Sequence, residues 1–176
     1  PLNIVSARAA VVGSTLVNVM CNAGYNTQSE YYINDTGGQI ERLVNSFEAR
    51  CYTLLSEPKK VPEDGYHGEY LIDYAKNFLK EYKDKFLSLN ANEQRELLRN
   101  YILEAIISDQ KRELTNFRCN FDRFFRESEL RKSGKVEFII DKLREKDAVF
   151  EKDGALWFRA SQYKKGTEDS VIVKSN

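Results

Sequence analysis

The order of apolar segments in residues 1–55 constrains the fold most strongly. Residues 7–23 are apolar around most of the helical circumference, which predicts a buried helix with Ser6 as its N-cap. A short strand is expected over 28–33, and apolar residues in 40–54 recur at the spacing of a second helix. Strand end, helix, strand and helix in this order are typical of the start of a parallel α/β sheet.

Helices dominate the chain after residue 55. A segment rich in proline and glycine, 56–68, predicts a long loop, and apolar stripes predict helices over 70–82, 97–106 and 133–146. Two apolar runs around Asp153-Gly154 predict a β-hairpin, and residues 170–174 predict a last strand. The expected fold is an α/β unit that is split by a mostly helical insertion of about a hundred residues.

The composition excludes several classes of protein. With 41% apolar and 31% charged residues it is typical of a soluble globular domain, and its net charge of zero gives no global attraction to nucleic acid or anionic lipid. No apolar run approaches the roughly 18 residues of a membrane span, so no membrane contact is expected. Cys21, Cys51 and Cys119 are widely spaced, which favours buried thiols in a reducing cytosol over disulfides or a zinc site.

The sequence is expected to start and to stop within structured segments. It begins Pro-Leu-Asn without a targeting segment, and it ends just after a strand-like run. We therefore expect a part of a longer protein. Its unpaired strand edges would favour self-association.

The turn before the first helix is a candidate anion site. A helix start presents unsatisfied N–H groups and the positive end of the macrodipole, and ligands of parallel sheets bind at the carboxyl ends of the strands. Arg8, one turn inside, could add a cation. The alternative is that this turn is empty, as most such turns are.

Other catalytic motifs are weak in this sequence. His67 is the only histidine, so a nucleophile–histidine pair would need it, yet a loop side chain that hydrogen-bonds a helix start is the more frequent role. The spacing of His, Cys and carboxylates offers no metal site, and the chain has neither a Walker-type loop nor GxGxxG.

Residues 111–135 form a basic segment with interleaved phenylalanines. Eight basic and four acidic residues give it a net charge of +4. It could grip a nucleic-acid backbone and stack bases, although aromatic core residues beside a solvated charged face are the more frequent explanation. The residues are Lys111, Arg112, Arg118, Arg123, Arg126, Arg131, Lys132 and Lys135, with Phe117, Phe121, Phe124 and Phe125.

Several blocks in consecutive order resemble the arginyl-tRNA synthetase family. They are Pro1-Leu-Asn-Ile-Val-Ser-Ala-Arg-Ala-Ala-Val-Val-Gly13, Glu30-Tyr-Tyr-Ile-Asn-Asp-Thr-Gly-Gly-Gln-Ile40, Tyr66-His-Gly-Glu-Tyr70, Phe121-Asp-Arg-Phe-Phe-Arg-Glu-Ser128, Gly154-Ala-Leu-Trp-Phe-Arg159 and Val171-Ile-Val-Lys-Ser175. The resemblance covers essentially the whole chain. The Tyr-Tyr-Ile-Asn-Asp and Leu-Trp-Phe-Arg blocks are highly specific as a set.

The resemblance implies a class I aminoacyl-tRNA synthetase with a Rossmann-type catalytic core. Residues 1–55 would be the first part of that core, 56–160 a mostly helical catalytic insertion that ends in a hairpin, and 161–176 a return strand toward the core. The family uses ATP with Mg²⁺ as substrate, without a tightly bound cofactor, to activate arginine and transfer it to tRNA(Arg). It also implies a cytoplasmic, monomeric parent, and a fragment that is inactive by itself.

The sequence departs from the family at the nucleotide signature. Where the family has His-Ile-Gly-His, this chain has Asn3-Ile4-Val5-Ser6. Asn3 and Ser6 are the expected catalytic positions, and with Arg8 they are the expected nucleotide contacts, but their neutral hydrogen bonds are weaker than those of charged donors. The site is an active natural variant, a decayed site or a deliberately altered one, and the preserved blocks favour the first.

A second group of candidate residues follows the short strand. Asn34, Asp35 and Gln39 are possible cleft residues, with simple turn and capping roles as an equal alternative. The rival function for the whole chain is a non-catalytic RNA-binding module on a synthetase-derived scaffold, which would use the basic segment.

Overall fold

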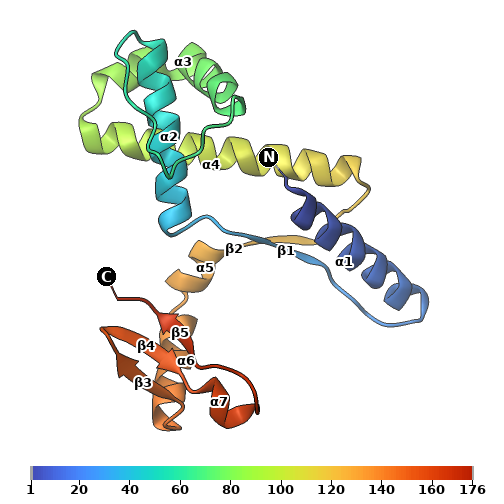
Figure 1. Cartoon of the computed structure of the whole chain (residues 1–176). Helices are drawn as coiled ribbons and strands as arrows, with labels where there is room; N and C mark the ends of the chain where they lie inside the picture. The colour runs from blue at the N-terminus through green and yellow to red at the C-terminus, as the bar shows by residue number, and fades with distance from the viewer. Residues whose placement is uncertain (1, 176) are drawn as a thin grey trace. The chain divides into compact units, whose positions relative to one another are not determined.

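The computed structural model describes residues 2–175 and divides into two compact units, Pro1–Ser128 and Glu129–Asn176 (Figure 1). Pro1, which opens the first resembling block, and Asn176 lie outside the described residues. The unit boundary follows residue 128 and so differs from the divisions expected after residues 55 and 160. The assignment of those expected ranges to parts of a catalytic domain stays a prediction.

Three long helices build the core of the first unit. They are α2 (Gly38–Leu54), α3 (Tyr70–Ser88) and α4 (Ala91–Asn116). The apolar stripes predicted all three, and each helix is longer than its stripe. Asn90 and Glu93 form a capping box at the start of α4, whereas α2 and α3 begin without a side-chain cap. The buried side chains between them are Ile40, Leu43, Val44, Phe47, Cys51, Leu71, Ala75, Phe78, Phe86, Leu98 and Ile102.

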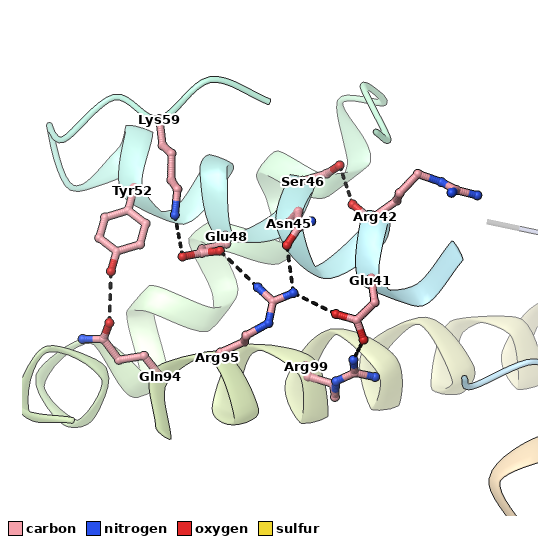
Figure 2. A network of polar contacts seen from close by, with 10 residues as sticks. All are labelled: Glu41, Arg42, Asn45, Ser46, Glu48, Tyr52, Lys59, Gln94, Arg95 and Arg99. Atoms are coloured by element: carbon pink, nitrogen blue, oxygen red, sulfur yellow. Dashed lines mark hydrogen bonds and ion pairs between the residues drawn. The ribbon is translucent and has the colours of Figure 1, made fainter. Parts of the chain in front are cut away.

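A polar network fastens α2 to α4 beside this core (Figure 2). The Arg95 guanidinium donates to Glu41 Oε2 at 2.8 Å and to Asn45 Oδ1 at 2.9 Å. The same side chain pairs with Glu48, and Arg99 pairs with the other oxygen of Glu41. Because these side chains are only partly exposed, the network fixes the start of α2 relative to α4.

A pair of short parallel strands adjoins the helical core. β1 (Glu30–Ile33) lies where a strand was expected, and it pairs in parallel with β2 (Arg123–Arg126), which we had not predicted. The adjacent phenylalanines in Arg-Phe-Phe-Arg do not alternate with polar residues, so this segment carried no period-2 strand signal. The mixed α/β class is confirmed. The Rossmann-type assignment stays a prediction, because the described part of this sheet has two strands.

The first helix, α1 (Ile4–Asn22), forms as predicted, but the expectation that it is buried is wrong. Ala10 is its one buried side chain, packed against Leu114 and Cys119, whereas Val12 and Leu16 are about 60% exposed. Apolar periodicity indicates which face of a helix is apolar but not whether another element packs on it. Within residues 2–175, only one side of α1 is packed against other residues. The helix start also differs, since Asn3 rather than Ser6 is the N-cap.

The same helix corrects the expectation about membrane-length segments. By length and composition α1 could cross a membrane, and only 6% of its apolar window is buried. Length and composition alone do not separate a membrane span from the core helix of a larger soluble protein. One such helix near the N-terminus is therefore weak evidence for a membrane.

The second unit is a small sheet with short helices. After α5 (Glu127–Lys132), which crosses the unit boundary, come α6 (Lys135–Glu145), β3 (Val149–Lys152), β4 (Ala155–Phe158), α7 (Ala160–Tyr163) and β5 (Ser170–Val173). The predicted hairpin is confirmed: β3 and β4 are antiparallel, and Asp153 and Gly154 both have positive φ, as a type I′ turn requires. β5 adds to β4, so the strand order is β3-β4-β5.

Candidate functional site

The start of α1 is held by Asn3. Its side-chain oxygen accepts a hydrogen bond from the backbone N–H of Ser6 at 2.8 Å, which is the usual N-cap geometry. This bond occupies one of the amides that an anion would use at a helix start. An incoming phosphate would therefore have to displace the Asn3 side chain to reach the Ser6 amide.

A cavity of about 360 Å³ lies against this helix start. It brings together four predicted site residues. Asn3 and Ser6 lie at the start of α1, Asn34 directly follows β1, and Gln39 lies in the first turn of α2. The other lining residues come from β1, α2, α3, α4 and the loop before α3. They are Tyr31, Tyr32, Ile33, Ile40, Leu43, Tyr66, Tyr70, Leu103, Ile106, Ile107 and Gln110. We call this the tyrosine cleft.

The tyrosine cleft has an uncharged, hydrogen-bonding lining. Its polar groups are amides, one serine hydroxyl and tyrosine phenols, and its described lining includes no Asp, Glu, Lys, Arg or His. Burial raises the pKa of Tyr31 and of Tyr70, so these phenols stay protonated at neutral pH. In the amide orientation that satisfies its neighbours, Asn34 Nδ2 donates to the Thr36 carbonyl oxygen at 2.9 Å and to Glu127 Oε2 at 3.2 Å.

Asp35 and Arg8 lie outside the cleft. The Asp35 carboxylate is buried, and it accepts hydrogen bonds from the backbone N–H of Ser128 at 2.9 Å and from the Ser128 hydroxyl at 2.6 Å. Arg8 is exposed and is absent from the lining of the cleft. The geometry of Asp35 therefore matches a capping role at the start of α5, the alternative considered for it from the sequence.

A second hydrogen-bonded Asp–Ser pair lies at the other end of the β1–β2 strand pair. Asp122 Oδ2 accepts from the backbone N–H of Ser29 at 2.7 Å and from its hydroxyl at 2.8 Å. These hydrogen bonds lower the pKa of Asp122. With Asp35 and Ser128 at the far end, two Asp–Ser pairs fix the register of β1 on β2, and sequence alone gave no signal that such distant residues pair.

A second cavity, of about 480 Å³, shares Asn3, Tyr70 and Gln110 with the tyrosine cleft. Here the Tyr74 hydroxyl donates to Asp109, and Arg112 pairs with the other carboxylate oxygen of Asp109 at 2.6 Å. The Tyr74 hydrogen bond, then Arg112, lower the pKa of Asp109, while burial and this carboxylate raise the pKa of Tyr74. The carboxylate is thus ionised and already neutralised by its own neighbour.

His67 takes the loop role rather than a catalytic one. Its ring Nε2 lies 3.2 Å from the Glu63 carbonyl oxygen, and its own carbonyl accepts from Arg50 at 3.2 Å. It does not line the tyrosine cleft. Across the described residues, no group of three or more His, Cys, Asp or Glu side chains could hold a metal ion.

Three of the four phenylalanines of the basic segment are packed or covered, whereas Phe117 is 52% exposed. Lys111 covers the Phe124 ring at 4.7 Å and Arg123 covers Phe125 at 4.8 Å. Phe121 and Phe124 pack against Tyr31 beside Leu114. Phe121, Phe124 and Phe125 therefore pack against other rings or contact the chain's own cations.

Comparisons with known proteins give one consistent result. The chain is 41% identical over 175 residues to "Arginine--tRNA ligase 1" of Halalkalibacterium halodurans, and 42% identical over 177 residues to the arginine–tRNA ligase of Caldanaerobacter subterraneus subsp. tengcongensis. A solved structure from Campylobacter jejuni with the provisional name arginyl-tRNA synthetase superposes with a TM-score of 0.81 at 28% identity. No protein-family model matches the chain.

The matches cover nearly the whole of this chain but a minor part of its relatives. The chain spans about 31% of the length of each of the two curated relatives, and the superposition covers 99% of this chain and 38% of the solved one. The resemblance predicted from the sequence blocks is thereby confirmed. From end to end, this chain is similar to one segment of the arginine–tRNA ligases.

Proposed function

We propose that this chain is the segment of an arginine–tRNA ligase that begins its Rossmann-type catalytic domain and carries the helical insertion. The observation behind this proposal is the end-to-end similarity to arginine–tRNA ligases at about 40% identity. A ligase that contains this chain would activate arginine with ATP and Mg²⁺ and transfer the arginyl group to tRNA(Arg). As a soluble translation enzyme it would act in the cytoplasm, as a monomer.

In this proposal, the start of α1 faces the phosphates of ATP. The Asn3 amide and the Ser6 hydroxyl would donate neutral hydrogen bonds where the family signature has two histidines, and Arg8 would supply the nearest cation on α1. Because the Asn3 oxygen caps the helix, Nδ2 is the atom of this amide that would donate to an incoming oxygen. Loss of one well-placed donor to a developing charge costs about 10²–10³-fold in rate.

The test is ATP–pyrophosphate exchange with arginine and tRNA. It compares a ligase that contains the unaltered Asn3-Ile4-Val5-Ser6 turn with the triple variant Asn3→His, Val5→Gly and Ser6→His. We expect activity in the unaltered ligase and faster exchange in the variant. Exchange only after restoration would show a decayed nucleotide site, and an RNA-binding module would then explain the chain better.

The 176-residue chain is expected to be inactive by itself, since it spans about 31% of the length of its curated relatives. Arginine-dependent exchange by this chain alone would contradict that expectation. The same preparation reports its oligomeric state, for which the exposed apolar side of α1 favours self-association.

A further inference from the structure

The segment that follows β4 in the second unit presents an exposed aromatic ring. Tyr163 ends α7 and is 62% exposed. One face of its ring packs flat on Phe158 of β4, with centroids 5.5 Å apart and an angle of 9° between the ring planes. No other ring and no cation of the described residues contacts Tyr163, so the outer face of its ring is open to solvent. The ring is thus a flat apolar surface with a second ring behind it.

A second stacked ring pair of this unit is covered differently. Phe150 and Trp157 stack across β3 and β4 with centroids 6.3 Å apart. The chain's own cations contact both rings, since the Arg159 guanidinium lies 4.8 Å from the Phe150 centroid and Lys152 Nζ lies 5.7 Å from that of Trp157. A planar ligand would have to displace these cations, whereas at Tyr163 it would displace only water.

Hydrogen bonds fix the loop that carries Tyr163. Asp169 Oδ1 accepts from the Ser161 backbone N–H at 3.0 Å and from the Ser161 hydroxyl at 2.8 Å, and these bonds close the loop at its base. Nearer the tip, the Thr167 backbone N–H donates to the Lys164 carbonyl oxygen at 3.2 Å. The loop therefore holds Tyr163 in place before a ligand binds, which reduces the conformational entropy lost on binding.

Unpaired cations lie next to this ring in the sequence. Lys164 and Lys165 directly follow Tyr163, both are exposed, and neither forms an ion pair with a described residue. The Asp169 carboxylate is engaged by Ser161, which leaves Glu168 as the exposed acid of the loop. An open aromatic face with adjacent lysines matches an unpaired base and the phosphates beside it, because stacking accepts any base and ammonium groups neutralise the backbone.

We propose that Tyr163, Lys164 and Lys165 form a contact site for single-stranded RNA. Tyr163 stacks on one base, and the two lysines bind the adjacent phosphates. The proposal deepens the proposed function, because it gives the second unit a role in holding unpaired nucleotides, and it rests on that function only for the source of the RNA. The site lies outside the basic segment, residues 111–135, which the sequence suggested for RNA.

The test is titration of the 176-residue chain into a single-stranded uridine oligonucleotide that carries one 2-aminopurine, a base whose fluorescence falls when it stacks. We expect saturable quenching and binding that weakens with salt. Tyr163→Ala should weaken binding by about 5- to 150-fold, the range for loss of one stacked base, and remove the quenching, whereas Tyr163→Phe keeps both.

The lysines are tested by the salt dependence of the same binding. Replacing Lys164 and Lys165 together by glutamine should lower the slope of log K against log salt by about 1.4, since each phosphate contact of a single strand contributes about 0.7. Glu168→Gln should tighten binding, because it removes a negative charge from the loop. Lys80 and Lys83, two exposed lysines of α3, are the matched pair, and their replacement by glutamine should leave the slope unchanged.

Tyr25→Ala is the control for the ring, since Tyr25 is 64% exposed and lies in the first unit. Equal binding by Tyr163→Ala and Tyr25→Ala, or equal slopes in the two lysine pairs, overturns the proposal. Adhesion to phosphatidylglycerol vesicles that is lost in Tyr163→Ala while RNA binding persists also overturns it, and assigns the ring to a lipid surface. Failure of pyrophosphate exchange while the oligonucleotide still binds through Tyr163 would instead refute the ligase assignment alone.

Discussion

Replacement of Ser46 by alanine tests the connection between the helical core and the cleft. Ser46 Oγ is fully buried; it donates to the Arg42 carbonyl oxygen at 2.8 Å and accepts from the Tyr66 N–H at 2.8 Å (Figure 2 shows the first bond). Its loss leaves the Tyr66 N–H without an acceptor, which costs about 1–3 kcal/mol. Alanine regains about 0.5 kcal/mol of helix propensity in α2, so we expect a net loss of about 1–2 kcal/mol.

The matched control is Thr53→Ala, which also lies on α2. The Thr53 hydroxyl donates to the Ala49 carbonyl oxygen at 2.8 Å, as the Ser46 hydroxyl donates to Arg42, but no backbone N–H of the described residues donates to it. Because such a bond within a helix adds little stability, Thr53→Ala should stay within about 0.5 kcal/mol of the unaltered chain. The difference between the two variants isolates the bond to Tyr66.

The measurement is urea unfolding followed by circular dichroism at a constant m-value, together with hydrogen exchange of the Tyr66 amide. For a chain of this size, the expected loss lowers the melting temperature by about 2–8 °C. Exchange at the Tyr66 amide should rise sharply in Ser46→Ala and not in Thr53→Ala. A Ser46→Ala chain as stable as the control, with a protected Tyr66 amide, would refute the claim that this hydroxyl holds the loop.

Three further predictions concern charge and thiols. Arg95→Met should destabilise the chain by about 0.5–1 kcal/mol at low salt and by less in 1 M NaCl, measured by urea unfolding, because the Arg95 and Glu41 side chains are 40% and 44% exposed. The Ser29 backbone N–H and then its hydroxyl lower the pKa of Asp122, so their stabilising effect is present above the carboxyl pKa of the unfolded chain and is lost as the pH falls through the lower folded value. Ser29→Ala keeps the backbone bond and should therefore make this acid limb of the stability–pH curve shallower without removing it. Burial raises the pKa of Cys51 to about 12, so a thiol reagent at pH 8 should modify the exposed Cys21 rapidly and Cys51 only on unfolding, as peptide mass mapping would show.

Local sequence patterns determined most of the secondary structure. The stripes of α2, α3 and α4, the strand β1 and the Asp153-Gly154 hairpin follow from periodicity and turn chemistry, which act over a few residues. The resembling blocks predicted the similarity to arginine–tRNA ligases, and the comparisons confirmed it. Within the candidate site, the sequence named Asn3, Ser6, Asn34 and Gln39, and the fold places all four around one cavity.

Tertiary structure decided what depends on contacts between distant residues. Residues 93 positions apart meet in the pairing of β1 with β2 and in the hydrogen bonds of Asp35 with Ser128 and of Asp122 with Ser29. No local sequence pattern encodes contacts over such a separation. The prediction that α1 is buried was wrong for a related reason. The apolar residues of a helix show that it can be buried, but they do not specify which element packs against it. The uncharged lining of the tyrosine cleft likewise exists only once six separate segments meet, because the chemistry of a cavity belongs to the side chains that the fold turns inward.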